Sequence, residues 1–482
     1  MNRSMIRYVT SWILRIEGLL LCSSIVIGLI YREFAVLPAY LIVIAGCEGI
    51  GFLLSKQPGD NRIYQKSGYI TVALAWIVMS AVGALPFVLT GEIPNYIDAL
   101  FEIVSGFTTT GSSILTNVEA LSHASLFWRS FSHWIGGMGV LVFILMFIPM
   151  KGGSQMNLMR AESPGPDVSK FVPRVHNTAS ILYKIYIGMT IGQIVCLLIA
   201  RMPWFDTLCI TFGTAGTGGF GILNSSCAAY TPVQQWIITI AMIAFGVNFS
   251  FYFLLLYHRP KEAFKMEEVR AYILIILASI ALITVQIFTR TDLYHHLSDA
   301  VRDAAFQVGS IITTTGFSTT NFDLWPSFSK WILVLLMICG ACAGSTGGGM
   351  KVSRILVLLK TLKKELFQIV HPRSVRKVML DGETVEHTVL RSINVFTAVY
   401  FLIFGLSVLI ISLDGFSMET NFTAVAATLN NIGPGLAGVG PASNFSAYSP
   451  ISKLILTFDM LAGRLEIFPM LLLFVPSIWQ RS

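Results

Sequence analysis

The chain has 482 residues, of which 54% are hydrophobic and 12% are charged, whereas about 25% are charged in an average soluble domain. This composition excludes a water-soluble protein and favours one that is solvated mainly by lipid. The formal net charge of +7 does not indicate nucleic-acid binding, because the basic residues alternate along the chain in a way that follows membrane topology.

Apolar stretches long enough to cross a bilayer, which takes about 20 residues, recur from one end of the chain to the other. They predict about ten crossings and no soluble domain, and therefore an all-α polytopic membrane protein. The first stretch carries Arg15 and Glu17 and lacks a cleavage site of small residues, so we expect it to be retained. The expected spans are residues 8–30, 35–54, 67–90, 126–148, 181–200, 236–257, 271–288, 331–359, 390–413 and 454–475.

Lys and Arg cluster in every second connection between these spans. They occupy residues 3–7, 56–66, 151–174, 259–270 and 351–377, whereas the connections at 111–128, 222–235, 316–329 and 433–452 contain neither. The positive-inside rule then places the basic connections and the N-terminus in the cytoplasm.

Four segments share one layout: an apolar span, a half-span of about three turns, a turn that contains glycine, a polar external stretch and a second apolar span. The half-spans with their turns are residues 98–111, 206–218, 303–316 and 421–433. We expect the residues that open them to be helix N-caps: Asp98, Asp206, Asp303 and Asn421. Each second span also has a glycine nine or ten residues after its start: Gly137, Gly246, Gly340 and Gly463.

A chain that enters a bilayer and turns back leaves backbone groups unpaired, which is tolerated only where protein covers them or where they line a wet cavity. A helix that ends there directs the negative end of its dipole at the turn. Glycine permits positive φ, so neighbouring carbonyl groups can point to one side. Four such turns around an axis would form a ring of carbonyl oxygens that replaces the hydration shell of a cation.

These motifs resemble the Trk/Ktr/HKT superfamily of potassium transporters, and within it the bacterial TrkH-type membrane subunits, over nearly the whole length. The resemblance is carried by Thr-Thr-Thr-Gly111, Ala-Gly-Thr-Gly-Gly-Phe220, Thr-Thr-Thr-Gly-Phe317, Asn-Asn-Ile-Gly-Pro-Gly435, Cys-Ala-Gly-Ser-Thr-Gly-Gly-Gly349, His371-Pro-Arg and Leu461-Ala-Gly-Arg464-Leu-Glu466. It implies four span, half-helix, span (M1-P-M2) repeats around a pore. The implied units are an N-terminal two-helix extension at 1–66 and repeats at 67–150, 151–258, 259–378 and 379–482.

The resemblance also implies a potassium ion bound in the filter by residues before and at the four glycines. Because the second repeat has Ala215 and Gly216 where the first and third have Thr, we do not expect fourfold chemical symmetry. The implied potassium-site residues are Thr109, Thr110, Gly111, Gly216, Thr217, Gly218, Thr314, Thr315, Gly316, Asn431, Ile432 and Gly433.

A run of small residues interrupts the span at 331–359, where each glycine costs about 1 kcal/mol against alanine in a helix. This favours a helix broken in mid-membrane, which by resemblance would be a gating loop in the third repeat; close helix packing is the alternative. The resemblance makes Arg464 an electrostatic barrier and an anchor of the gate, although it could instead pair with Glu466 or Asp459. The implied gate residues are Gly340, Gly344, Ser345, Thr346, Gly347, Gly348, Gly349, Lys351 and Arg464.

Other interpretations are weaker. Gly216-x-Gly218-x-x-Gly221 matches a dinucleotide motif, but no strand is predicted before it. Cys339 and Cys342 lack a His partner, so we interpret them as packing residues and not as metal ligands. Glu102 either touches the ion path or is a hydrogen-bond partner for neighbouring backbone. The histidines are scattered along the chain and do not form a pair that could act in one catalytic pocket, so the sequence does not predict an enzyme.

The predicted function is potassium uptake through a carbonyl filter, gated by the intramembrane loop and a cytosolic regulatory subunit. A proton- or sodium-coupled secondary cation transporter is the alternative, although inverted repeats would fit it better than four direct ones. The resemblance implies a multi-pass protein of the bacterial cytoplasmic (inner) membrane that forms a homodimer. It also implies a cytosolic TrkA-type partner that carries the nucleotide site, so that this chain itself binds no nucleotide.

Overall fold

The computed structural model describes residues 3–55, 65–139 and 175–479. Over these residues the fold is all-α apart from one small hairpin, in which β1 (Met379–Leu380) pairs antiparallel with β2 (Glu383–Thr384). The longer helices are α1 (Arg3–Ile30), α2 (Leu37–Leu54), α3 (Gln65–Gly83), α5 (Tyr96–Phe107), α6 (His123–Gly137), α9 (Val175–Ile199), α10 (Trp204–Ala215), α11 (Pro232–Phe245), α12 (Phe249–Leu256), α14 (Glu267–Arg290), α15 (Leu297–Ile312), α16 (Ser327–Cys339), α17 (Val352–Val370), α18 (His387–Ile411), α19 (Met418–Leu429) and α20 (Pro450–Arg464). Short helices and 3₁₀ turns are α4 (Leu85–Leu89), η1 (Val118–Ala120), α13 (Pro260–Ala263), η2 (Phe322–Leu324), η3 (Ser412–Asp414), η4 (Ala437–Val439), α21 (Phe468–Leu472) and α22 (Pro476–Trp479).

Six of the predicted spans are continuous helices that are long and apolar enough to cross a membrane. They are Ile6–Ile30, Leu37–Leu54, Gly68–Leu89, Ile181–Ile199, Glu267–Arg290 and His387–Asp414. Among the described residues, these helices account for six of the about ten predicted crossings. The expected basic connections at 56–66 and 151–174 lie largely outside the described residues.

The other four predicted spans are interrupted, each near the glycine that the sequence pattern singled out. α6 ends at Gly137, and the rest of that predicted span, from residue 140, lies outside the described residues. α11 and α12 are bent by 90° at a short break. α16 ends at Cys339, and α20 ends at Arg464. The glycine run of the third span predicts only one of these breaks.

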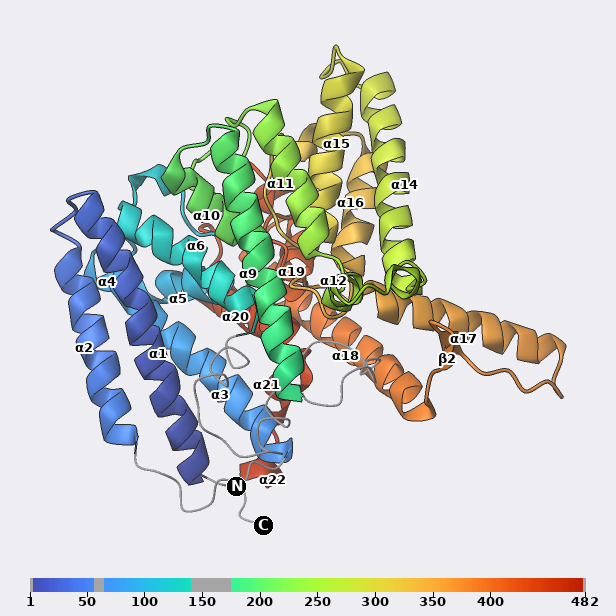
Figure 1. Ribbon diagram of the computed structural model, residues 1–482, viewed down its shortest axis with the longest axis horizontal. Helices are drawn as coiled ribbons and strands as arrows, with labels where there is room; N and C mark the ends of the chain where they lie inside the picture. The colour runs from blue at the N-terminus through green and yellow to red at the C-terminus, as the bar shows by residue number, and fades with distance from the viewer. Residues whose placement is uncertain (1–2, 56–64, 140–174, 480–482) are drawn as a thin grey trace.

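Four short buried helices, α5, α10, α15 and α19, occupy the interior of the molecule. Each one packs against two of the interrupted helices: α5 against α20 and α6, α10 against α6 and α11, α15 against α11 and α16, and α19 against α16 and α20. The last contact, between α19 and α20, leads back to α5, so the eight helices are arranged in a closed circle. Figure 1 shows α1 and α2 at one edge, α14 toward the opposite edge, and α17 reaching outward from the body.

The predicted N-caps are wrong, because the short helices begin earlier in the chain. The carbonyl side chain of Asn95 caps α5, accepting from the Ile97 N–H at 2.8 Å, and Ser417 caps α19. The predicted cap residues instead make tertiary contacts, which a local capping rule does not include. Asp98 pairs with Lys453 at 2.6 Å, Asp206 and Asp303 accept from the hydroxyls of Tyr230 and Tyr294, and Asn421 accepts from that of Tyr448.

Candidate functional site: a ring of four helix ends and the loop beneath it

The four short helices end in the same backbone geometry. The second residue after the end of each helix has a left-handed conformation, with φ of 55° at Thr109, 55° at Thr217, 59° at Thr314 and 57° at Asn431. The N–H of the following residue donates a hydrogen bond to the carbonyl oxygen of the residue five positions earlier, within the helix. These bonds run from Thr110 to Ser105, Gly218 to Gly213, Thr315 to Ser310 and Ile432 to Ala427, at 2.7–2.9 Å. This pattern is a Schellman motif, with threonine or asparagine in the place usually taken by glycine. A β-branched residue at positive φ is strained, so the surrounding structure must impose this conformation on the three threonines.

In the second predicted segment, 206–218, the glycine at positive φ comes one residue later than the predicted Gly218. The glycine that follows at positive φ is Gly111, Gly219, Gly316 or Gly433, with φ of 82°, 75°, 90° and 104°. Gly219 and not Gly218 is therefore the equivalent of Gly111, and Gly216 belongs to the helix end. The phenylalanine that follows both Gly219 and Gly316 is the signal that could have fixed this register from the sequence.

The four turns meet one another in a closed cycle, in which the glycine of each turn lies against the backbone of the next. We call these four turns the ring. A Cβ on Gly111 would collide with the carbonyl oxygen of Gly218, one on Gly219 with that of Thr315, and one on Gly316 with that of Ile432. A Cβ on Gly433 would lie 3.0 Å from the carbonyl oxygen of Thr110, which closes the cycle. The structure therefore brings the four sequence-predicted segments together, and glycine is required where they touch.

Side chains reinforce the junction between the first and fourth turns. The Ser112 hydroxyl donates to the carbonyl oxygen of Gly433 at 2.9 Å, and the Asn431 amide donates to the Thr110 hydroxyl at 2.9 Å. In the first and third repeats, the hydroxyls of Thr108 and Thr110, and of Thr313 and Thr315, pair at 2.8 and 2.7 Å. These threonine hydroxyls therefore have partners within the protein.

The loop from Gly340 to Lys351 lies against this ring. The Gly348 N–H donates to the Thr314 hydroxyl at 2.6 Å, and a Cβ on Gly348 would collide with the carbonyl oxygen of Asn430. Gly340, Gly344 and Gly349 have φ of 71°, 66° and 78°, which suits glycine. The loop is thus an irregular buried segment, and the alternative of simple helix packing does not describe it.

Three charged side chains hold the loop. Arg464 donates to the carbonyl oxygens of Gly137 at 2.9 Å and Thr346 at 3.0 Å, and also to that of Gly136. Lys351 donates to the carbonyl oxygen of Gly347. The predicted alternative partners of Arg464 have other contacts, since Glu466 pairs with Arg354 and Asp459 accepts from the Ser407 hydroxyl at 2.8 Å.

Glu268 is the third of these side chains, and the sequence analysis did not identify it. One oxygen of its buried carboxylate accepts from the N–H groups of Ala343 at 2.6 Å and Ser353 at 3.0 Å, at the two sides of the loop. Its other oxygen accepts from the Asn248 amide at 3.3 Å. An acidic residue at the start of an apolar span is the only signal for it in the sequence.

The other residues that the sequence analysis discussed, Glu102, the Gly216 motif and two cysteines, are part of the scaffold around the site. Glu102 is fully buried in contact with backbone and with Arg129, which agrees with the hydrogen-bond role among the two predicted for it. The Gly216 motif follows the helix α10, so it lacks the strand that a dinucleotide site needs. Cys339 and Cys342 are buried among the apolar residues of α14, α15 and α16.

Irregular backbone within a membrane protein is tolerated only where it is buried in protein or lines a water-filled cavity, and a buried ring of four helix ends is therefore what we expect of a transport protein. The sequence model described as "TrkH: Cation transport protein" matches residues 32–481. The chain belongs to this TrkH family, and it is a transport protein, not an enzyme.

Relatives match it from end to end. It is 36% identical to the Trk system potassium uptake protein TrkH of Salmonella typhimurium, over 99% of both chains. It is 31% identical to the Trk system potassium uptake protein TrkG of Escherichia coli K12, over the whole of both chains. The crystal structure of the potassium transporter TrkH from Vibrio parahaemolyticus is similar with a TM-score of 0.89, at 32% identity and with complete coverage of both chains.

Proposed function

We propose that the chain takes up potassium across the bacterial cytoplasmic membrane through the ring of four turns. The closed cycle of glycine and carbonyl contacts is the observation that carries this proposal. Four helix C-termini direct partial negative charge at the ring, which favours a cation there. Carbonyl oxygens in such a ring can replace the water shell of potassium, and because they carry no full charge the ion can also leave. The names of the relatives support potassium as the ion.

In this proposal each long helix, short helix and interrupted helix form one M1-P-M2 repeat around a central path. The repeats are 67–150, 151–258, 259–378 and 379–482, and residues 1–66 are a two-helix extension. Potassium is held by backbone carbonyls before the four glycines, in the register of the left-handed residues. The proposed set is Thr109, Thr110, Thr217, Gly218, Thr314, Thr315, Asn431 and Ile432, with Gly111, Gly219, Gly316 and Gly433 setting their direction.

The loop from Gly340 to Lys351 is the proposed gate. It lies against the ends of α15 and α19, where a cation leaving the ring would meet it. Arg464 adds a positive charge beside that exit, which raises the energy of a passing cation. We further propose that the N-terminus is cytoplasmic, that the protein is a homodimer, and that a cytosolic TrkA-type partner binds nucleotide and controls the gate.

Rubidium uptake into liposomes that contain the purified protein tests the filter. Gly316→Ser places a Cβ against the carbonyl oxygen of Ile432 at a position with φ of 90°. We expect the rubidium flux, or its preference over sodium in competition, to fall about tenfold or more, as expected when a strained backbone site costs at least about 1.4 kcal/mol. Gly415→Ser is the matched control, because Gly415 has φ of 77° but open space around it.

Two results would contradict parts of this proposal. If Gly316→Ser keeps both the wild-type rubidium flux and the wild-type ion preference, the ring is not the filter. If uptake under a membrane potential alone is absent and appears only with an imposed proton or sodium gradient, the protein is an ion-coupled transporter.

A further inference from the structure

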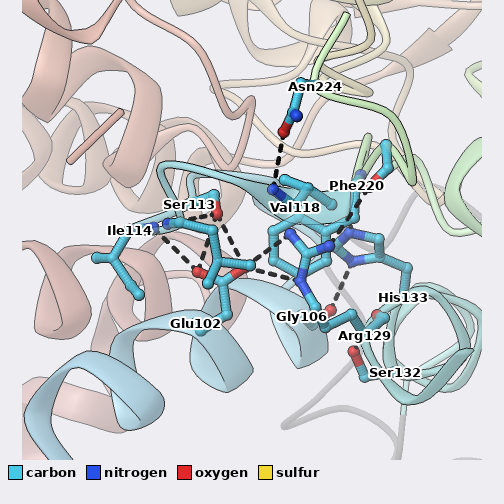
Figure 2. Close-up of polar contacts among 12 residues, drawn as sticks. Glu102, Gly106, Ser113, Ile114, Val118, Arg129, Ser132, His133, Phe220 and Asn224 are labelled. Carbon is cyan, nitrogen blue, oxygen red and sulfur yellow. Dashed lines mark hydrogen bonds and ion pairs between the residues drawn. The ribbon is translucent and has the colours of Figure 1, made fainter. Parts of the chain in front are cut away.

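A fully buried ion pair lies directly behind the ring, between its first and second turns. Glu102 on α5 is 0% exposed and Arg129 on α6 is 1% exposed. Nη2 and Nε of Arg129 both contact Oε1 of Glu102, at 2.7 and 2.8 Å (Figure 2). Such a pair loses the hydration of both charges, so it is expensive unless further hydrogen bonds satisfy it.

The carboxylate of Glu102 holds the chain that leaves the first turn. Its second oxygen accepts from the N–H of Ile114 at 3.0 Å, and both oxygens accept from the Ser113 hydroxyl at 3.0 and 3.1 Å. Ser113 and Ile114 lie two and three residues after Gly111. Figure 2 shows this segment curving over the carboxylate.

The guanidinium of Arg129 holds the chain that leaves the second turn. It donates to the carbonyl oxygen of Gly221 at 3.3 Å, and its central carbon lies 4.1 Å from the centre of the Phe220 ring. Phe220 and Gly221 follow Gly219. One ion pair therefore connects the exit segments of two neighbouring repeats.

His133 adds a second connection between the same two repeats. Its Nδ1 lies 2.7 Å from the carbonyl oxygen of Gly106, and its Nε2 lies 3.2 Å from the backbone nitrogen of Phe220. A carbonyl only accepts and an N–H only donates, so the neutral ring carries its proton on Nδ1 and accepts at Nε2. The end of α5 and the second turn are thus tied through one imidazole.

The fold itself does not require charges at these positions. Counted from the left-handed residue of each turn, the equivalents of Glu102 are Ile210, Gln307 and Ala424. Counted from the N-cap of each interrupted helix, the equivalents of Arg129 are Ile238, Leu333 and Leu456. Ile210 and Ile238 are both fully buried, so the second repeat fills the same places with two apolar side chains.

We propose that Glu102 and Arg129 are positioning residues that set the ion selectivity of the ring by fixing its first and second turns relative to each other. The inference rests on the proposed filter function. The preference of a carbonyl ring for one ion depends on the size of the ring and on the number and field of its dipoles. A site of this kind keeps its geometry only if the residues behind it are themselves locked in place.

The double variant Glu102→Ile with Arg129→Ile tests this inference, because it gives the first repeat the apolar pair of the second. Replacing a buried ion pair by apolar residues is often neutral for stability, so we expect a protein that elutes and unfolds like the wild type. We expect its preference for rubidium over sodium to fall about tenfold with less change in maximal flux, because the turns lose their fixed geometry and not their path.

Two further variants separate positioning from folding. Arg129→Lys keeps the charge but cannot reach Glu102 with two nitrogens and Gly221 with a third, so we expect an intermediate loss of selectivity. Asp98→Asn with Lys453→Met removes another ion pair of α5, at 2.6 Å, that does not contact the turns. We expect this control to keep the wild-type selectivity.

Wild-type selectivity in either a folded double variant or Arg129→Lys would overturn the inference, and so would an equal loss of selectivity in the Asp98 and Lys453 control. A wild-type protein without preference for rubidium over sodium would instead overturn the proposed filter, which is a separate result.

Discussion

The ring and the loop beneath it both consist of buried, irregular backbone, but they are held in different ways. The ring is built from four helix ends that touch through glycine and carbonyl groups. Arg464 and Lys351 donate hydrogen bonds to the loop, and the carboxylate of Glu268 accepts one from it. Moving the ring would require four packed helices to separate, whereas the loop is held by these charged contacts and by hydrogen bonds such as that from the Gly348 N–H to the Thr314 hydroxyl. From this difference we propose that the ring is the fixed element and that the loop is the element that moves.

Among the variants that test this comparison, we expect Arg464→Ala to have the largest effect on rubidium flux. The change removes the donors to the carbonyl oxygens of Gly137 and Thr346 and the positive charge beside the proposed exit. A hydrogen bond from a charged group is worth about 1.5–3 kcal/mol, so we expect rubidium flux into liposomes to rise about tenfold or more, with ion preference unchanged. Arg464→Lys is the control, because one ammonium group keeps the charge but replaces only part of the hydrogen bonds of the guanidinium. We expect its flux to lie between those of the wild type and Arg464→Ala.

A flux that stays at the wild-type level in a folded Arg464→Ala protein would mean that this arginine does not hold the loop shut. A changed ion preference would mean that the loop and the ring are not separate elements.

A smaller effect is expected for Glu268→Gln, which keeps the shape of the side chain but removes its charge. The carboxylate accepts from the N–H groups of Ala343 and Ser353. A neutral acceptor makes a weaker bond by roughly 1 kcal/mol, so we expect the flux to rise severalfold. The neighbouring Glu267→Gln is a matched control, because Glu267 pairs with Lys360 away from the loop and should leave the flux unchanged. Equal fluxes in the two variants would contradict a role of Glu268 in holding the loop.

The sequence predicts those parts of the site that are encoded locally. The four half-spans and their glycines are recognisable because each needs a short apolar helix followed by a residue that tolerates positive φ. All four segments meet in the structure. The register of the second turn was predicted one residue too early, at Gly218, because Gly216, Gly218 and Gly219 are all compatible with a turn and only the tertiary contacts select Gly219.

The parts that depend on distant partners could not be predicted. Asp98 has the sequence environment of an N-cap, yet Lys453 attracts it to α20. The bend between α11 and α12 has no glycine run, and it follows from contacts such as that of the Gly246 carbonyl with the N–H of Cys342 at 3.1 Å. Glu102 and Arg129 belong to different helices, and nothing in either local sequence indicates that they pair.

The smallest expected effect concerns the strained residue of the ring itself. Thr217 has φ of 55°, and the fourth repeat uses Asn431 at the same place with φ of 57°. Asparagine tolerates the left-handed region better than a β-branched residue does. We therefore expect Thr217→Asn to keep rubidium flux and selectivity and to change the free energy of unfolding by no more than about 0.5 kcal/mol.

Thermal unfolding in detergent and liposome flux would measure both quantities. Thr217→Pro is the contrasting variant, because proline fixes φ near −65° and removes the N–H that donates to the carbonyl oxygen of Thr214 at 3.0 Å. If asparagine were as damaging as proline, the threonine side chain, and not the backbone conformation, would define this position. The ring would then depend on side-chain contacts as the loop does, and the contrast between the two regions would fail.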